Sequence, residues 1–400
     1  MLFALLFIIG VSYVVIQIAQ GYRLDLQKKN FAPNGLLVAK STPDSAQVWI
    51  DGKLNTATDN TINLTPGDYQ VDIKKEGYTT WSKKLTIKKE LVTTADAHLF
   101  STFPSLRALT FTGADNPVLS PDGQRIVFGV ATSSAANKSV WVVDLVNRPL
   151  GISSEPRQII KNNPDGRDFS KGVYTWSPDS KQILITLHEK AQNVKNATVE
   201  RNFLVDADKI TPEAQLIDLG SELKPLLKRW EDEKEVRRLD QVRKMPEKLF
   251  SAIDGKVKDI EFSPDDTKIK FTATASATIP DEIITPLPST NDTPEHRQIE
   301  PKKIYVYDIK EDKNFLISDE PGSSKDSPTS IIWFPTSQHL FMIDQGKIYV
   351  MEYDGMNKMN VYSGDFMDSF AATFPDSNRI VILTAIGKDS PTNLYAVSIR

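Results

Sequence analysis

Four aspartates stand at equivalent points of a repeated pattern, and a ring of such carboxylates would suit metal binding or acid–base chemistry. They are Asp122, Asp179, Asp265 and Asp376. Recurrence in copy after copy is what a structural role requires, whereas a single active site would break the symmetry of a repeat. We therefore interpret the four carboxylates as turn residues rather than as a site.

The other motifs of catalysis are missing from the sequence. His188-Glu189 begins like the zinc-protease motif H-E-x-x-H, but Gln192 occupies the position of the second histidine. Neither a G-x-S-x-G elbow nor a glycine-rich phosphate loop occurs, and the remaining histidines are scattered: His98, His296 and His339. The chain has no cysteine, which excludes disulfides and thiolate nucleophiles. We expect no catalytic residue, no metal ligand and no cofactor, and predict that the protein is not an enzyme.

Six lysines make one stretch of the chain locally basic: Lys74, Lys75, Lys83, Lys84, Lys88 and Lys89. The simpler interpretation is a solvated face of a strand. The alternative is contact with anionic lipid headgroups or cell-wall polymers close to a membrane, where each basic residue contributes about 1 kcal/mol. The net charge of −4 argues against a nucleic-acid partner, because nucleic-acid binders normally carry a basic excess.

Five short turns, each followed by an apolar strand, organise the C-terminal part of the chain. Proline presets φ at the second position of a tight turn, and Asp, Ser and Gly tolerate the conformations that follow. The turn residues are Pro121, Asp122, Gly123, Pro178, Asp179, Pro264, Asp265, Pro335, Pro375 and Asp376. A third strand follows in every copy, and three of the five end in Asp. Each copy is thus one small antiparallel sheet, and a series of such sheets is expected to form a β-propeller.

The last copy stops directly after its third strand, so its outer strand is expected elsewhere. Residues 107–112 read as a strand without a sheet of its own, and we predict that they pair with the last blade and close the ring. These copies resemble TolB-like, WD-repeat-like propeller blades over residues 105–400. The resemblance implies a propeller of five blades, with six as the alternative. It is weaker in the last two turns, where Phe334 and Phe374 replace Ser and Thr336 replaces Asp.

Residues 35–101 alternate short strands with turns such as Asp51-Gly52 and Pro66-Gly67. Apolar residues recur at every second position, which predicts one buried and one solvated face. From Ser41-Thr42-Pro43 to Lys75-Glu76-Gly77-Tyr78 the segment resembles a PEGA domain, although the Pro-Glu-Gly-Ala string itself is absent. The resemblance implies a small extracytoplasmic β-sandwich of bacterial and archaeal surface proteins, with no enzymatic activity attached to it.

The N-terminal segment is expected to determine where in the cell the protein lies. Residues 1–21 are almost entirely apolar, close to the roughly 20 residues of a membrane span, and residues 22–34 form a linker. We predict a single anchor that contacts the membrane through residues 2–20, with the rest of the chain extracytoplasmic. A cleaved signal peptide is the alternative, because small residues occur at residues 19–21.

Two insertions interrupt the strand pattern. Residues 221–250 carry apolar residues at helical spacing, which predicts one or two amphipathic helices between the second and third blades. Residues 276–301 contain five prolines and are expected to form a long exposed loop within the third blade.

The sequence therefore predicts a mainly β protein: an N-terminal transmembrane helix, a small PEGA-like β-sandwich and a propeller with a helical insertion. Its expected function is that of a non-catalytic, membrane-anchored extracytoplasmic scaffold that binds an unknown protein or cell-envelope glycan. The alternatives are an enzyme with an unrecognised active site in the central channel, or a subunit of an envelope transport or secretion assembly.

Overall fold

The structure is a computed structural model, and it describes residues 7–12, 15–16, 23–25, 30–32, 34–131, 138–146, 155–161, 166–190, 198–285, 287, 291–319, 330–344, 346–367, 370–387 and 390–400. Within these residues, no helix is both long enough and apolar enough for a membrane span. Of the expected anchor, residues 7–12 and 15–16 are helical, and its other positions lie outside the described residues. In the linker, β1 (Arg23–Asp25) pairs antiparallel with β2 (Asn30–Ala32).

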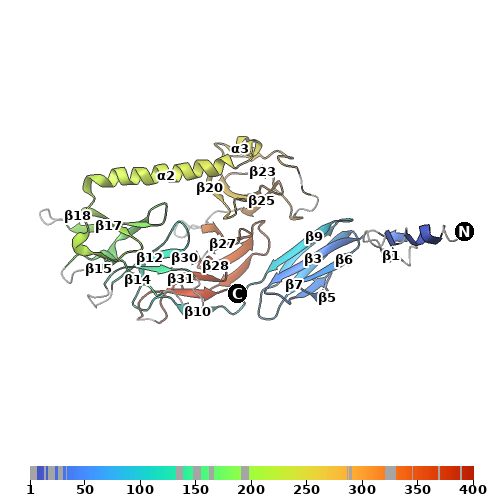
Figure 1. The fold of residues 1–400 in the computed structure, drawn as a ribbon, viewed down its shortest axis with the longest axis horizontal. Coiled ribbons are helices and arrows are strands. Elements are labelled where there is room, and N and C mark those ends of the chain that lie inside the picture. The colour runs from blue at the N-terminus through green and yellow to red at the C-terminus, as the bar shows by residue number, and fades with distance from the viewer. Residues whose placement is uncertain are drawn as a thin grey trace.

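Two sheets packed on one core make up the N-terminal β domain (Figure 1). Their strand orders are β6-β3-β9 and β5-β4-β7-β8. The strands are β3 (Gly35–Thr42), β4 (Gln47–Ile50), β5 (Lys53–Ala57), β6 (Asn60–Leu64), β7 (Gly67–Lys74), β8 (Trp81–Ile87) and β9 (Val92–His98). Alternate residues point between the sheets, where Val48, Val71 and Ala95 are fully buried. The period-two pattern of the sequence therefore corresponds to the two faces of each sheet.

Five further sheets carry the five turns, one turn each, between the first and second strand (Figure 1). We call them blades 1 to 5 in chain order. Blade 1 has β11 (Asp115–Leu119), β12 (Arg125–Val130), β13 (Ser139–Asp144) and β14 (Arg157–Gln158); blade 2 has β16 (Val173–Trp176), β17 (Gln182–Lys190) and β18 (Thr198–Asp206); blade 3 has β20 (Val257–Phe262), β21 (Lys268–Ala273), β24 (Ile304–Asp308) and β25 (Lys313–Ser318). Blade 4 has β26 (Ser330–Trp333), β27 (His339–Asp344), β28 (Lys347–Glu352) and β29 (Met359–Tyr362); blade 5 has β30 (Ala371–Thr373), β31 (Arg379–Thr384), β32 (Asn393–Ser398) and β10 (Ser105–Ala108).

The turns share one backbone conformation. Their fourth residues all have a positive φ, between 55° and 69°, although only Gly123 is a glycine. In blades 1 to 3 the turn serine donates to the turn aspartate at 2.5–2.7 Å and accepts the backbone N–H five residues further on. The side chains of Ser and Asp thus stabilise a conformation that costs an ordinary residue free energy.

The strand that completes the last blade comes from the other end of the propeller sequence. Strand β10 pairs antiparallel with β32, from Ser105 opposite Ser398 to Ala108 opposite Tyr395. Leu109 continues the pairing by donating to the carbonyl of Leu394. The predicted pairing with the last blade is confirmed, but the strand spans residues 105–108 rather than 107–112. It covers the edge of β32, which would otherwise offer unpaired backbone groups.

Hydrophobic clusters join blade 1 to blades 2 and 5, and blade 4 to blades 3 and 5. Within the residues that the structure describes, no such cluster joins blade 2 to blade 3. Helix α2 (Leu223–Arg243) buries Leu226 and Trp230 against Leu184 of blade 2, whereas α3 (Glu247–Ile253) packs on blade 3. The helices predicted between the second and third blades are therefore found there, and they occupy the seam between blades 2 and 3.

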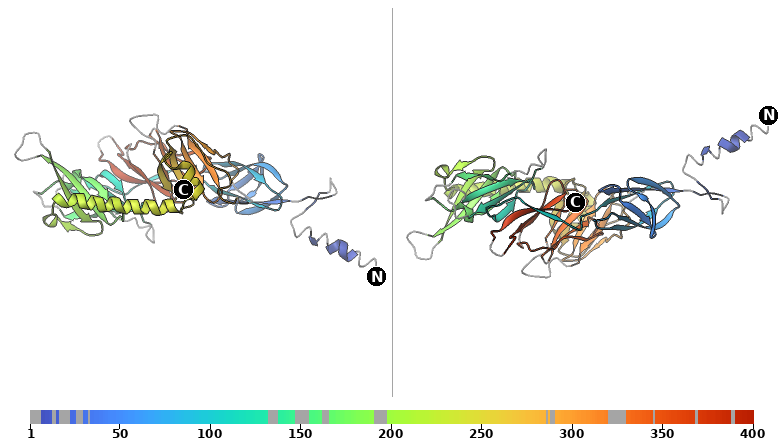
Figure 2. Two further views of the ribbon diagram at one scale, coloured as in Figure 1. Left: turned by 90° about the horizontal axis from the view of Figure 1, so that it is seen from above. Right: turned by 90° about the horizontal axis from the view of Figure 1, so that it is seen from below.

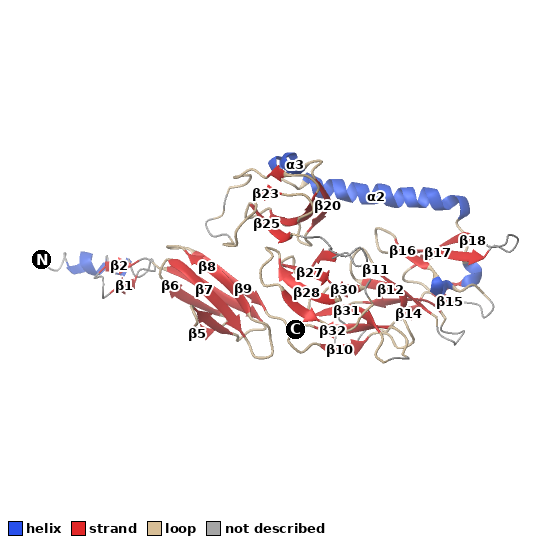
Figure 3. Cartoon of the chain, turned by 180° about the vertical axis from the view of Figure 1, so that it is seen from behind, coloured by secondary structure: helices blue, strands red, loops and turns tan. Residues whose placement is uncertain are grey.

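Helix α2 reaches from the sheet of β17 and β18 to α3 and the sheet of β20 (Figures 1 and 3). Its C-terminal half contacts the turns of both blades. Arg237 donates to the carbonyl of Pro178 at 2.8 Å, and Lys244 lies 2.5 Å from the carboxylate of Asp266. Leu227 and Leu239, which helical spacing placed on the apolar face, are exposed. The helix thus contacts blade 2 near its N-terminus and the two turns near its C-terminus, and part of its apolar face is exposed to solvent.

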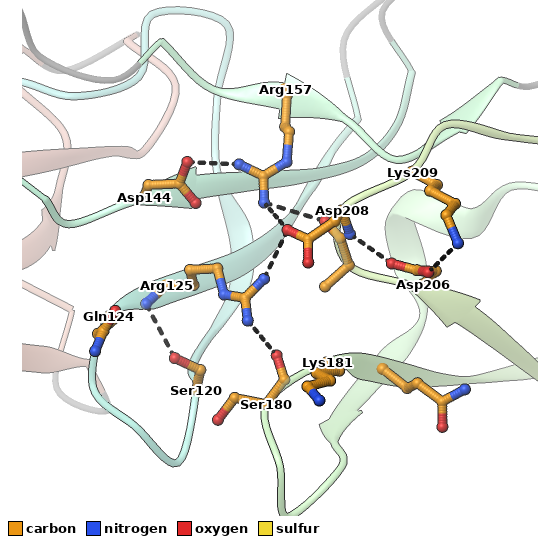
Figure 4. Close-up of polar contacts among 12 residues, drawn as sticks. Ser120, Gln124, Arg125, Asp144, Arg157, Ser180, Lys181, Asp206, Asp208 and Lys209 are labelled. Carbon is orange, nitrogen blue, oxygen red and sulfur yellow. Dashed lines mark hydrogen bonds and ion pairs between the residues drawn. The ribbon is translucent and has the colours of Figure 1, made fainter.

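Polar groups tie blade 1 to blade 2 next to their turns (Figure 4). Arg125 lies 3.0 Å from Asp208 and donates to the carbonyl of Ser180 at 2.5 Å. Arg157 of the outermost strand pairs with Asp144 at 2.7 Å and also reaches Asp208, at 3.4 Å. The carboxylate at the end of strand β13 therefore anchors a neighbouring strand, which agrees with a structural role for the strand-ending aspartates.

Candidate binding site at the domain junction

The N-terminal β domain and the propeller lie end to end along the molecule (Figure 2), joined by the chain directly after β9. Phe100 is fully buried in the core shared by blades 4 and 5. Its carbonyl accepts the N–H of Thr79, while the N–H of Ser101 donates to the carbonyl of Ile399, each at 2.8 Å. The connection is thus packed and hydrogen-bonded on both sides rather than being a free linker.

Strand β8 is the edge of its sheet, and propeller side chains cover this edge. The backbone N–H of Ser82 donates to Oδ1 of Asn357 at 3.0 Å, and the N–H of Thr86 donates to Oδ2 of Asp292 at 2.7 Å. An exposed edge strand presents unpaired N–H groups that invite pairing with other chains. The propeller satisfies two of these groups and so fixes the register of the docking.

Lys83 projects from the same edge into the propeller. Its ammonium lies 2.5 Å from Oε2 of Glu352 and 2.6 Å from Oδ2 of Asp354, and only 11% of its side chain is exposed. Trp81 donates its indole N–H to Glu352 beside it. This position corrects the expectation for Lys83, because a lysine held between two buried carboxylates does not reach a headgroup or a wall polymer.

The proline-rich insertion takes part in this junction. Strands β22 (Ala277–Thr278) and β23 (Gln298–Ile299) pair at its base. Beyond them, Asn291 and Thr293 donate to Oδ2 of Asp354 at 2.6 and 2.7 Å. The expectation of an exposed loop is therefore wrong for residues 291–293, which are partly buried and bridge blade 3, blade 4 and β8.

A cleft of about 260 Å³ lies where these parts meet. Side chains of both domains line it, as do the insertion and blades 3 and 4. Its titratable and aromatic lining residues are Trp81, Lys83, Asp96, His98, Asp292, Glu311, His339, Glu352 and Tyr353. A concave site with convergent polar groups is the default location for a ligand. The cleft is therefore the candidate binding site of the described residues.

One buried ammonium, that of Lys83, pairs with two buried carboxylates, of which Glu352 lines the cleft and Asp354 does not. Burial alone would lower the pKa of Lys83, but Glu352 and Asp354 outweigh it and raise that pKa above its ordinary value. Burial would raise the pKa of Asp354, yet Lys83 and the donors from the insertion hold it below its ordinary value. Burial and the neighbouring Asp354 raise the pKa of Glu352. Because one cation serves two anions, Glu352 takes up a proton more readily than Asp354.

Two histidines meet at the other side of the cleft. The rings of His98 and His339 are 4.9 Å apart, edge to face, and one belongs to each domain. Burial lowers the pKa of both, and Arg400 lowers them further. His339 also lies beside Thr336, with 3.2 Å between Nδ1 and Oγ1. Both imidazoles are thus neutral near pH 7, so the charged groups of the cleft are the carboxylates and Lys83.

The other lysines of the basic stretch lie on the remaining surface of the β domain. Lys84 pairs with Asp68 at 2.8 Å with 69% of its side chain exposed, and Lys89 lies 3.5 Å from Glu90. Lys74 pairs with Asp72 and lies over the ring of Trp49. The other two are Lys75, which donates to the carbonyl of Asp44, and the exposed Lys88.

The turn aspartates of the sequence do not converge in the structure. Asp122, Asp179 and Asp265 each accept from their own turn serine, and Asp376 accepts the N–H of Asn378 at 3.0 Å. Among the described residues, no group of three or more acidic or histidine side chains could hold a metal ion. The geometry therefore places each carboxylate in its own turn.

Sequence reasoning missed the junction residues, of which Glu352, Asp354 and His339 matter most. A signal was present, since the fourth turn departs from the Ser-Pro-Asp pattern. Phe334 and Thr336 stand in that turn, and both contact His339. The repeat thus changes at the blade on which the β domain docks. Residue spacing alone could not show that the change marks an interface.

Comparison with known proteins gives the class of the N-terminal domain. Residues 34–102 match the family model of the PEGA domain, so the predicted resemblance is confirmed. We call residues 34–102 the PEGA-like domain from here on. No curated protein matches the chain by sequence.

Among solved structures the chain is similar to TolB-like propellers. The putative TolB from Agrobacterium tumefaciens is 13% identical, with 70% of this chain and 76% of that chain covered and a TM-score of 0.22. The β-propeller domain of the trilobed protease from Pyrococcus furiosus is 12% identical, with 92% and 84% covered and a TM-score of 0.21. A structure of prolyl endopeptidases is also 12% identical, with 89% and 50% covered and a TM-score of 0.25. Likenesses this distant transfer no activity to the chain.

Proposed function

We propose that the protein is a non-catalytic scaffold of the cell envelope, anchored in the membrane through residues 1–21. The PEGA-like domain stands between the anchor and the propeller. The propeller has five blades, and α2 and α3 take the place that a sixth blade would fill. In this arrangement the propeller is presented outside the membrane at a fixed orientation.

The docking of β8 carries the proposal. A spacer fixes orientation only if it does not hinge freely on what it carries. Ser82, Lys83 and Thr86 all bond to propeller side chains, and Phe100 is inserted between blades 4 and 5. Relative motion of domains is the usual expectation unless their interface is extensive and well satisfied. An interface with this many specific bonds favours a rigid presentation unit over a flexible tether.

The partner of such a scaffold is a protein or a cell-envelope glycan. The scaffold could equally serve as a subunit of an envelope transport or secretion assembly, in which case the partner is another subunit. The exposed lysines Lys74, Lys75, Lys84, Lys88 and Lys89 add attraction to anionic surfaces near the bilayer. Replacing Lys84, Lys88 and Lys89 by Glu should weaken binding of the chain from residue 22 onward to anionic vesicles and leave neutral vesicles unaffected.

Cell fractionation tests the anchor. The full chain is expected in carbonate-washed membranes, and a chain that begins at residue 22 is expected in the soluble fraction. Protease added to intact cells should digest the propeller. Full protection of the propeller would contradict the proposed orientation. A mature N-terminus near residue 22, found by mass spectrometry, would replace the anchor with a cleaved signal peptide.

A catalytic role is the second candidate, because Lys83, Glu311, His339 and Glu352 converge on one cleft. Burial raises the pKa of Glu311, as expected for a carboxyl poised to carry a proton. Turnover of a peptide or glycoside that is lost in Glu311→Gln would favour an enzyme. An equal rate in Glu311→Gln and the unmodified chain would show that Glu311 takes no part in that turnover.

A further inference from the structure

The titratable rings of His98 and His339 touch across the boundary between the two domains. His98 ends strand β9 of the PEGA-like domain, and His339 begins strand β27 of blade 4. Their rings are 4.9 Å apart at an interplanar angle of 85°, and His339 is 2% exposed. Phe100 packs edge to face on His339 from the same side, at 5.8 Å between ring centroids. A charge on either ring would therefore sit inside the interface.

Arg400 fixes the protonation state of this contact by geometry. Its Nη2 lies 3.1 Å from Nδ1 of His98. A guanidinium has only donors, so Nδ1 of His98 must accept and cannot carry a proton. Protonation of that nitrogen would remove the bond and leave two cations 3.1 Å apart in a half-buried setting.

We propose that this histidine pair makes the docking of the PEGA-like domain on the propeller acid-sensitive, so that acidification releases β8 and opens the cleft. Undocking exposes both rings to water, where they can be protonated without meeting each other or Arg400. In the docked state the rings stay neutral. Protons therefore bind preferentially to the undocked state and shift the equilibrium toward it.

The other charged groups around the pair act in known directions. Asp96 favours a charged His98, whereas Lys83 disfavours a charged His339. Asp376 faces Arg400 from the turn of blade 5. The carboxylates of Asp292, Glu311 and Glu352 line the same cleft, and Asp354 pairs with Lys83. The pKa of Glu352 is raised in the docked state, so its protonation favours docking and opposes the histidines as the pH falls.

The histidine contribution begins at the ordinary histidine pKa of 6.5. Docking is unaffected by the pair above that pH and loses stability below it, until the lowered pKa of the docked state is reached. At about pH 5.5, one histidine that stays neutral in the docked state lowers the equilibrium constant for docking about tenfold. Two such histidines lower it about a hundredfold. Protonation of Glu352 reduces the total effect of acid on the docking equilibrium. It does not alter the contribution of the two histidines to that effect.

Hydrogen exchange of the full chain tests the proposal, because the amides of Ser82 and Thr86 are bonded to the propeller itself. Their protection, corrected for the intrinsic exchange rate, is expected to fall up to a hundredfold between about pH 7.5 and about pH 5.5. Core amides of both domains, such as those of Val71 and Phe271, should keep their protection. In His98→Asn, which retains an acceptor for Arg400, the loss of protection should be smaller by up to about tenfold.

His188→Asn is the matched control, since His188 is exposed on blade 2, and it should behave like the unmodified chain. Three results would overturn the proposal. One is unchanged protection of Ser82 and Thr86 at the lower pH. Another is an equal loss at the core amides, which would mean acid unfolding. The third is the same fall in His98→Asn and His188→Asn, which would remove the histidine pair from the account.

Discussion

The ammonium of Lys83 lies 2.6 Å from Oδ2 of Asp354, although 271 positions of the sequence separate the two residues. The pair joins an edge strand of the PEGA-like domain to the end of β28 in blade 4. Both side chains are nearly inaccessible to solvent, at 11% and 0% exposed. The ion pair therefore acts as a bond between domains rather than as a surface contact.

Removal of Lys83 should strongly destabilise the protein. Lys83→Ala leaves Glu352 and Asp354 buried without their cation, and breaking a buried pair typically costs about 3 kcal/mol or more. Lys84→Ala is the control on the same strand, because its ion pair with Asp68 is exposed and an exposed pair contributes little to stability. Urea unfolding followed by tryptophan fluorescence measures both. Equal effects of the two substitutions would show that Lys83 is not a bond between domains.

The same lysine predicts a dependence on alkaline pH. The pKa of Lys83 is raised above its ordinary value of 10.5 in the folded state. The folded state therefore holds this proton more tightly, and its stabilisation is complete below 10.5 and lost as the pH rises through the raised pKa. The difference in unfolding free energy between the unmodified chain and Lys83→Met should be constant from about pH 7 to about pH 10 and narrow above that. A difference that widens there would contradict the pairing.

The turn serines of blades 1 to 3 should contribute to stability through at least two hydrogen bonds each. Ser263→Ala removes a donor to Asp265 at 2.7 Å and an acceptor for the N–H of Lys268 at 2.9 Å. A buried N–H left without a partner costs about 1–3 kcal/mol. Thermal unfolding should show the loss, whereas Ser330→Ala, at an exposed position of β26, should change little. An unaffected Ser263→Ala would leave the Ser-Pro-Asp pattern without a structural reason.

Helix α2 should be needed to complete blade 2. Trp230 is 8% exposed and packs beside Leu184, so Trp230→Ala opens a cavity and should cost about 3 kcal/mol. Leu239→Ala, further along the helix at 43% exposed, should cost less than about 0.5 kcal/mol. Hydrogen exchange of β17 should rise in the first variant alone. Similar hydrogen exchange of β17 in the two variants would show that the packing of α2 does not stabilise blade 2.

The sequence predicts those parts of the fold that local chemistry encodes. Pro121 and Asp122 favour a tight turn through their own conformational preferences. The outer strand, predicted at residues 107–112 and found at residues 105–108, could be recognised because it had no sheet of its own. The turn aspartates could be recognised as structural on the same grounds. These features need no knowledge of the rest of the chain.

The candidate site could not be predicted in this way. Alternation along β8 places Lys83 on the same face as the buried Trp81 and Leu85, and Lys84 on the opposite, exposed face. It does not show that Lys83 meets carboxylates of blade 4. Asn291 lies in a proline-rich stretch that is typical of an exposed loop. Its contact with Asp354 depends on how the two domains dock. Docking of two domains produces no periodic pattern of residues from which it could be predicted. The altered turn around Phe334 is a local feature of the sequence that coincides with the docking site.

The central claim is that the PEGA-like domain and the propeller form one rigid unit at neutral pH. The chain has no cysteine, so Lys53→Cys in β5 and Lys347→Cys in β28 provide two unique labelling sites. Electron–electron resonance between spin labels at these sites in the full chain measures the distribution of their separation. We predict a single narrow distribution at about pH 7.5 that broadens when Lys83→Ala is added. A broad or bimodal distribution in the chain that keeps Lys83 would contradict a rigid unit and, with it, the scaffold function.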